Sequence, residues 1–218
     1  GTVDYITDVV KANKINTVAK DKDKGLTMDS YPSDREDFLF MNTVAGACQD
    51  QSVRQALAYG FDREAYIASY YKLDDKDAKL AYVPGLFGNP VSGGNGAYVR
   101  GEEKVDGATY YDYDVEKAKQ ILDDAGWTVG SDGIREKDGQ KLSIKFLATK
   151  EKDAMDTMIP MLQKQWGELG VDFKANTMEF NTVIATVSDD SAVGDWDVSY
   201  LGNSFTSPED TGVDYLIQ

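Results

Sequence analysis

The chain has 218 residues, of which 41% are hydrophobic and 11% aromatic, so it carries enough apolar material for a folded core. Its 38 acidic and 23 basic residues give a net charge of -15, which repels a phosphate backbone, and we expect no nucleic-acid partner. Histidine is absent and Cys48 is the single cysteine, which excludes an imidazole base, a catalytic triad, an internal disulfide and a histidine-bound metal. We therefore expect no metal and no cofactor, and interpret Cys48 as a small buried side chain.

The first elements in chain order are a strand and two helices. Up to about residue 37 the chain is polar and has no hydrophobic period, which predicts connecting structure rather than core. Residues 37–44, DFLFMNTV, form a short apolar run bounded by polar residues, which is typical of a buried strand. Two tandem helices follow, the first capped by Asp50 or Ser52 and the second capped by Asp62.

The next segment, residues 74–112, is dense in proline and glycine, which predicts a long loop without helix or strand. Loops of this length in a folded domain are functional or disordered. The aromatic side chains Tyr82, Phe87 and Tyr98 argue against disorder, because disordered segments have few aromatic residues to bury.

A sharply bounded helix is predicted within YDVEKAKQILDDAGW, residues 113–127. Asp114 is placed to cap its start, and Gly126 is placed to take the left-handed conformation that ends it. Trp127 then follows the glycine, where it can fold back onto Leu122. The tryptophan is predicted to close the end of the helix.

The rest of the chain predicts an α/β lobe. Residues 131–149 indicate a hairpin that turns at Asp138–Gly139, its second arm being the alternating Leu142, Ile144 and Phe146. A helix over residues 153–169 contains Pro160, which either kinks it or marks its first turn. A strand, a helix and a strand are then expected at 171–179, 180–189 and 196–202.

Motifs for bound cofactors are absent from this pattern. DKDKG, residues 21–25, has its glycine one position too early for a calcium loop, and GGNG, residues 93–96, fits neither a dinucleotide fingerprint nor a phosphate-binding loop. The many acids leave a carboxylate pair of the glycosidase type open, although no local signature marks one.

In their order along the chain, the segments resemble the extracellular solute-binding proteins of the peptide/nickel class of ABC importers, the oligopeptide- and dipeptide-binding proteins. The matching segments cover nearly the whole chain: GTVDYI (1–6), FLFMNT (38–43), VRQALAYGFDREAYI (53–67), YVPG (82–85), YDVEKAKQILDDAGW (113–127), DGIREKDGQKLSIKF (132–146), LQKQWGELGVDF (162–173) and WDVSYLG (196–202).

The resemblance implies one α/β lobe of a two-lobed protein, of the type II periplasmic-binding-protein fold, with a mixed sheet flanked by helices. The chain then resembles a C-terminal fragment that contains the second lobe. Residues 1–37 would be the tail of the first lobe and the approach to the hinge. Residues 38–202 would be the second lobe with its hinge-crossing strands, and residues 203–218 would return toward the first lobe.

The resemblance also implies a function. Such proteins are not enzymes: they capture peptides or a related solute between the lobes by hinge closure and deliver it to the transmembrane subunits of a permease. They act in the periplasm or at the extracellular face of the cell membrane, held there as lipoproteins by an anchor that would lie outside this chain. A peptide-signal receptor of the same fold, or a secreted hydrolase with a carboxylate pair, stays open as an alternative.

Seven ligand-binding positions are carried over from the resemblance. Many peptide binders of this class have a tryptophan after the last glycine and then an aspartate that pairs with the free amino terminus of the peptide. Here the segment reads LGNSFTSPED, and Glu209 or Asp210 would have to replace that aspartate. This difference favours a ligand without a free peptide amino terminus, such as a modified peptide, an oligosaccharide or another solute. The expected ligand-binding residues are Asn42, Phe180, Tyr200, Asn203, Ser204, Phe205 and Thr206.

Overall fold

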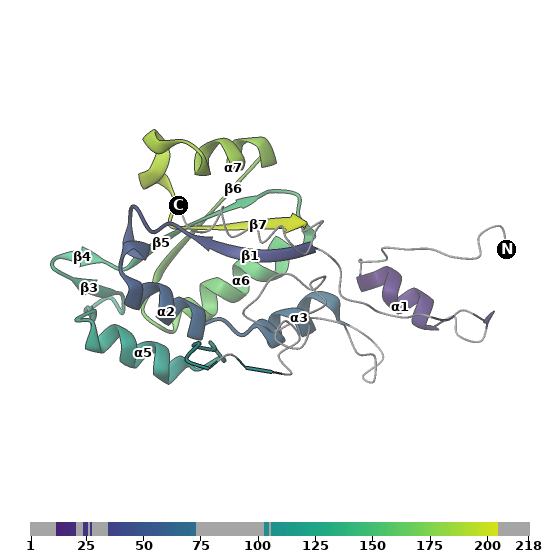
Figure 1. Ribbon diagram of the computed structural model, residues 1–218, viewed down its shortest axis with the longest axis horizontal. Helices are drawn as coiled ribbons and strands as arrows, with labels where there is room; N and C mark the ends of the chain where they lie inside the picture. Colours follow the sequence, from purple (N-terminus) through teal and green to yellow (C-terminus); the bar gives the residue numbers. More distant parts are fainter. Residues whose placement is uncertain are drawn as a thin grey trace.

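A four-stranded mixed sheet forms the centre of the fold (Figure 1). The computed structural model describes residues 12–20, 24–25, 27, 35–72, 103–104 and 106–204. Strands β5, β6 and β7 run parallel, whereas β1 pairs antiparallel with β7 along its whole length. The strand order is β1 (Arg35–Met41), β7 (Val198–Ser204), β5 (Ser143–Thr149) and β6 (Asp172–Met178).

Helices cover both faces of this sheet, which makes the predicted type II periplasmic-binding-protein-like α/β lobe. The larger layer, below the sheet in Figure 1, consists of α2 (Gln51–Tyr59), α3 (Arg63–Tyr71), α5 (Val115–Asp124) and α6 (Asp153–Gly167). The smaller layer, above it, consists of α7 (Phe180–Val187) and the 3-10 segment η3 (Asp190–Asp195). A second 3-10 segment, η2 (Ala47–Gln49), leads into α2.

The helix starts confirm the predicted caps. The Asp50 carboxylate accepts a hydrogen bond from the Ser52 amide at 2.9 Å, Asp50 being the N-cap of α2. Asp62 and Asp114 cap α3 and α5 in the same manner. Each of these side chains satisfies an amide of the first helical turn that has no partner inside the helix.

The end of α5 is closed as predicted. Gly126 has φ +86°, and the Trp127 amide donates to the Leu122 carbonyl at 2.9 Å. The Trp127 indole is buried, and its Nε1 donates to the Asp50 carboxylate at 3.2 Å. One tryptophan therefore joins the end of α5 to the start of α2, a tertiary contact that the local pattern did not indicate.

The hairpin prediction is confirmed at its turn and wrong in its second arm. Asp138 and Gly139 have φ values of +52° and +77°, the left-handed pair of a type I′ turn. The arms are β3 (Arg135–Lys137) and β4 (Gln140–Lys141), and β2 (Thr128–Val129) adds a third strand. Leu142 still donates its amide to the Arg135 carbonyl at 2.7 Å, but Ile144 and Phe146 belong to β5 of the main sheet, where they are buried against the helices.

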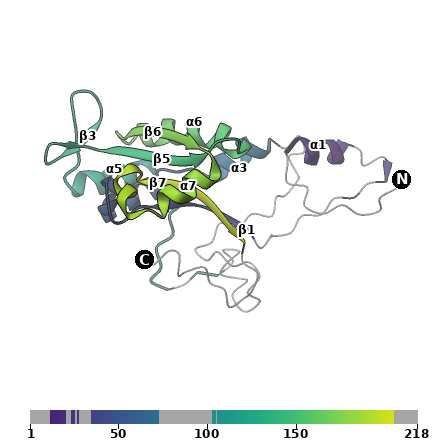
Figure 2. The ribbon, with the colours of Figure 1, turned by 90° about the horizontal axis from the view of Figure 1, so that it is seen from above.

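One helix was missed. The polar segment before residue 37 contains α1 (Ala12–Lys20), which was predicted as connecting structure. Ile15 is its one buried side chain among the described ones, and the Asn16 amide donates to the Lys72 carbonyl at the end of α3. Figures 1 and 2 place α1 beyond α3, at the end of the molecule opposite the β2–β4 hairpin. The predicted loop at 74–112 lies mainly outside the described residues.

Two apolar cores lie on opposite faces of the sheet. In β7, Val198 and Tyr200 face the larger core with α2, α5 and α6, whereas Leu201 packs against the smaller core under α7. Trp166 of α6 is fully buried in the larger core, where its Nε1 donates to the Leu57 carbonyl at 3.1 Å. In the smaller core Trp196 stacks with Phe40 at a ring distance of 5.7 Å.

A buried carboxylate fixes the edge of the sheet at which β5 and β7 begin. Asp197 is 2% exposed, and it accepts hydrogen bonds from the Ala47 amide at 3.0 Å and the Lys145 amide at 2.8 Å. Gly46 lies directly against it: a Cβ at Gly46 would stand 1.9 Å from the Asp197 Oδ1. The loop after β1 therefore depends on a glycine at this position.

A buried arginine ties together the ends of two helices. Arg135 is 3% exposed, its Nε donates to the Leu169 carbonyl at 2.7 Å, and its Nη1 donates to the Trp127 carbonyl at 2.5 Å. Nη1 also forms an ion pair with Asp123. The carbonyls after α6 and α5 thus receive donors that their own helices do not provide.

Burial of Cys48 is confirmed, and it predicts a stability that depends on pH. Burial, together with the negative charge of Asp197, raises the pKa of the Cys48 thiol from 9.0 to about 12. Above pH 9 the unfolded chain loses this proton while the folded chain keeps it. This group therefore lowers the free energy of unfolding as pH rises, by up to about 1.4 kcal/mol per pH unit between pH 9 and 12.

Urea unfolding of the wild type and of Cys48→Ala across pH 7 to 12 checks this expectation. The free-energy difference between the two proteins is expected to be constant below pH 9 and to fall above it. Parallel stability curves throughout would show that the folded thiol ionises at its ordinary pH.

Candidate functional site

The three parallel strands end at one edge of the sheet, which we call the carboxyl edge. It comprises the ends of β5, β6 and β7 and the residues that follow the first two, 150–152 and 179–180. Because β1 is antiparallel to β7, β1 begins at this edge, so the chain enters and leaves the sheet there. In open α/β sheets, ligands bind outside the carboxyl ends of the strands. The carboxyl edge is therefore the candidate binding site.

Charged side chains of the loops after β5 and β6 are held in place at this edge. The Lys150 amide donates to the Met178 carbonyl at 2.8 Å, and the Lys150 ammonium forms an ion pair with Glu179 at 2.6 Å. The hydrogen bond to Glu179 raises the pKa of Lys150. Because the charges of Lys150 and Glu179 cancel each other, the pair holds the two loops together without adding a net charge to the surface that a ligand would contact.

Tyr200 and Phe180, two of the predicted binding residues, differ in accessibility. Tyr200 in β7 is 5% exposed, and the Lys152 ammonium lies 5.1 Å from the centre of its ring. Phe180, the first residue of α7, is 51% exposed, and Ile184, one turn later, is 37% exposed. A ligand outside the sheet would therefore meet the exposed Phe180, whereas Tyr200 is buried in the larger core, on the face of the sheet opposite α7.

Ile184 and Lys152 were missed by sequence reasoning. The segment FNTVIATV contains no charged residue and buries Val183 alone, so α7 presents an apolar stripe of Phe180 and Ile184 to solvent. The spacing of four residues was a sufficient signal for this stripe. Lys152 had no comparable signal, since its proximity to Tyr200 arises from the sheet.

Asn42 lies at the opposite edge of the sheet, after the end of β1, and is not brought together with the other predicted residues. Its amide nitrogen donates to the Val193 and Trp196 carbonyls at 2.6 and 2.9 Å, and its oxygen accepts from the Val44 and Ala45 amides. This uses the full hydrogen-bonding capacity of the side chain. A ligand contact by Asn42 stays a prediction.

The other four predicted residues follow Tyr200 along the chain. Asn203 and Ser204 are the last residues of β7, and their backbones pair with Glu36 and Arg35 of β1. They therefore reach the carboxyl edge. Phe205 and Thr206 lie outside the described residues.

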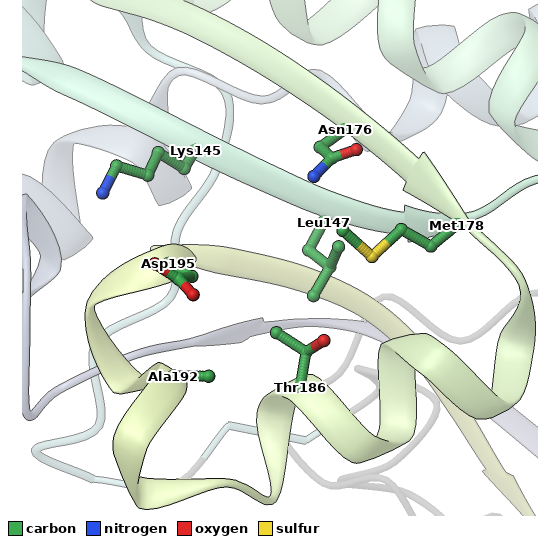
Figure 3. Close-up of a pocket in the computed structure, with 7 residues that line it drawn as sticks. All are labelled: Lys145, Leu147, Asn176, Met178, Thr186, Ala192 and Asp195. Atoms are coloured by element: carbon green, nitrogen blue, oxygen red, sulfur yellow. The ribbon is translucent and has the colours of Figure 1, made fainter.

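Two surface hollows extend over other parts of the lobe, the second of them reaching this edge at Met178. One, of about 440 Å³, lies between η2 and the hairpin, where the Asp50 carboxylate is occupied by Trp127 Nε1 and by Lys137 Nζ at 3.1 Å. These contacts and the Ser52 amide lower the pKa of Asp50, although burial acts in the opposite direction. The other hollow, of about 380 Å³, lies between the sheet and α7 (Figure 3).

In the part of the chain that the structure describes, no three metal-ligating side chains gather into a possible metal site. Nor does any described helix combine the length and apolar composition that crossing a membrane requires.

Solved structures share this fold. NikA from Brucella suis, in complex with Fe(III)-EDTA, superposes with a TM-score of 0.66 at 24% identity, over 92% of this chain and 36% of that protein. The oligopeptide-binding protein AppA from Bacillus subtilis, in complex with a nonapeptide, gives a TM-score of 0.66 at 21% identity, over 94% of this chain and 44% of AppA. At these identities the likeness establishes the fold.

Relatives are also similar in sequence. The oligopeptide-binding protein OppA of Lactococcus lactis subsp. cremoris is 30% identical over 155 residues, which are 69% of this chain and 24% of OppA. AppA of Bacillus subtilis is 26% identical over 202 residues, 92% of this chain and 33% of AppA. The chain thus spans between a quarter and a third of the length of these relatives. The family model of bacterial extracellular solute-binding proteins, family 5 (Middle), matches residues 1–216, and the chain belongs to this family.

Proposed function

We propose that this chain is the second-lobe part of the substrate-binding component of an ABC importer, which captures peptides or a related solute and delivers them to a permease. The observation that carries the proposal is the exposed, uncharged α7 stripe of Phe180 and Ile184 at the carboxyl edge of a solute-binding-protein lobe. Residues 38–202 would form this lobe, and the protein would act outside the cell membrane, in the periplasm or anchored as a lipoprotein.

Peptides suit this edge because of its chemistry. Lys150 and Glu179 neutralise each other, and the aromatic and aliphatic side chains beside them offer apolar contact to side chains of any sequence. A ligand held between this lobe and the rest of the protein contacts both, so it binds the closed state better and shifts the population toward closure. No reacting group is required, and we propose that the protein is not an enzyme.

Native mass spectrometry on the full-length protein, purified without denaturation, tests the ligand class. We expect a heterogeneous set of adduct masses that fragment as peptides. A single non-peptide mass would overturn the peptide assignment, and turnover of a bound oligosaccharide that one carboxylate-to-amide substitution abolishes would establish the hydrolase alternative. A receptor would also retain peptide, but transport into cells that depends on the adjacent permease distinguishes the importer.

Phe180→Ala tests the site itself. Truncation of an exposed aromatic anchor is expected to weaken binding of an eluted peptide about tenfold, measured by isothermal titration calorimetry. Asn181→Ala, on the same helix and also exposed, is the matched control and is expected to leave the affinity within about twofold. Equal affinities of Phe180→Ala and wild type would place the ligand elsewhere.

A further inference from the structure

The hollow under α7 lies on one face of the sheet and touches the carboxyl edge only at Met178, the last residue of β6. Its volume is about 380 Å³, within the range of small-molecule sites. It lies over the face of β5 and β6 that the smaller helical layer covers, and Figure 3 shows its walls formed by Lys145, Leu147, Asn176, Met178, Thr186, Ala192 and Asp195. We propose that this hollow binds a small zwitterion, an α-amino acid with an apolar side chain.

The charge at one end of the hollow carries the proposal. The Lys145 ammonium donates to the Gly194 carbonyl at 2.5 Å, so it is held beside the residue that precedes Asp195. Lys145 and Asp195 both line the hollow, and no ion pair joins these two described residues. Lys145 retains two N–H donors, and the Asp195 carboxylate is exposed. An ammonium and a carboxylate that flank one opening match the adjacent carboxylate and ammonium of an α-amino acid.

The rest of the hollow selects the side chain. Leu147, Met178 and Ala192 give an apolar floor, and Figure 3 shows Leu147 between Asp195 on one side and Asn176 on the other. Asn176 forms the far wall with an uncharged amide, and the Thr186 hydroxyl is already engaged with the Thr182 carbonyl at 2.8 Å. No charged group lines that end. A leucine- or methionine-sized side chain fits these surroundings, whereas a charged side chain has no counter-charge there.

This site reaches the proposed transport site only at Met178, the last residue of β6. Lys145 is in the first half of β5, away from the carboxyl edge, and neither Phe180 nor Tyr200 lines the hollow. The proposal therefore does not depend on the identity of the transported ligand.

Methyl NMR offers a local probe of this site, because Met178 lies in the floor. Full-length protein labelled with ¹³C at the methionine methyl groups gives a spectrum that includes the six methionines of this chain, and Met178→Leu assigns one of its resonances. Titration with L-leucine is expected to shift the Met178 resonance with a dissociation constant on the order of 1–10 mM, as suits exposed charges. The buried Met155 and Met158 of α6 are expected not to move.

Ligand analogues and variants decide the outcome. Isovalerate and isopentylamine each keep one charge of the zwitterion and are expected to bind at least threefold more weakly than L-leucine, as are Lys145→Met and Asp195→Asn with L-leucine. Lys164→Met, an exposed lysine of α6 in the helical layer on the opposite face of the sheet, is the matched control. Phe180→Ala is expected to leave the shift unchanged.

Three results would overturn the proposal. They are an unmoved Met178 resonance, equal binding of the singly charged analogues, and a shift abolished by Phe180→Ala but kept by both hollow variants. The last result would assign leucine to the transport site. Loss of peptide binding at the carboxyl edge, in contrast, would leave this titration unaffected.

Discussion

Substitution of Gly46 by alanine is expected to lower the free energy of unfolding by at least about 3 kcal/mol. Gly46 has φ +72° and ψ -163°, a region essentially restricted to glycine, where another residue costs about 1–3 kcal/mol. The new Cβ would also displace the Asp197 carboxylate from the Ala47 and Lys145 amides, and each buried amide left without a partner costs about 1–3 kcal/mol. Urea unfolding at neutral pH measures the loss.

Gly133→Ala is the matched control for this prediction. Gly133 also has positive φ, +83°, but a Cβ there would meet no atom within 4 Å. It therefore isolates the backbone strain, about 1–2 kcal/mol. Equal losses in the two variants would show that the contact with Asp197 has no energetic weight.

Removal of the Arg135 guanidinium is the second large effect that we expect. Arg135→Met keeps the apolar stem but leaves the Leu169 and Trp127 carbonyls without their donor, at a cost of about 3 kcal/mol in unfolding free energy. Arg135→Lys is expected to recover only part of this, because one ammonium cannot reproduce the planar fork that serves both helix ends. Chemical denaturation of the three proteins gives the ranking.

An exposed arginine provides the comparison. Arg63 donates to the Tyr111 carbonyl at 3.3 Å from a solvated position, so Arg63→Met is expected to change stability by less than about 0.5 kcal/mol. If Arg63→Met were as destabilising as Arg135→Met, the loss would reflect the general effect of replacing arginine and not the buried contacts of Arg135.

Local signals predicted most of the elements of this lobe. The caps at Asp62 and Asp114, the left-handed Gly126 and the turn at Asp138–Gly139 each follow from the chemistry of a few adjacent residues, and the structure has all of them. The order of strand and helix over 171–202 was predicted for the same reason, although β7 begins at Val198, two residues later than expected, and ends at Ser204.

What escaped prediction depends on residues far apart in sequence. The bond from Trp127 to Asp50, the buried position of Arg135 and the pairing of β7 between β1 and β5 are tertiary contacts without a local signature. The same holds within the candidate site. Phe180 was predicted from the resemblance to the family, whereas Lys152 was not predicted, because only the folding of the sheet brings it beside Tyr200.

The antiparallel pairing of β1 with β7 has a consequence for how this lobe is attached. Arg35 and Ser204 are partners in the register, so the segment between them starts and finishes at neighbouring points. Neighbouring chain ends are the property that makes a domain tolerant of insertion into another chain and of circular permutation. Residues 35–204 therefore have the geometry of a cassette, one that a short loop joining its two ends would convert into a continuous ring.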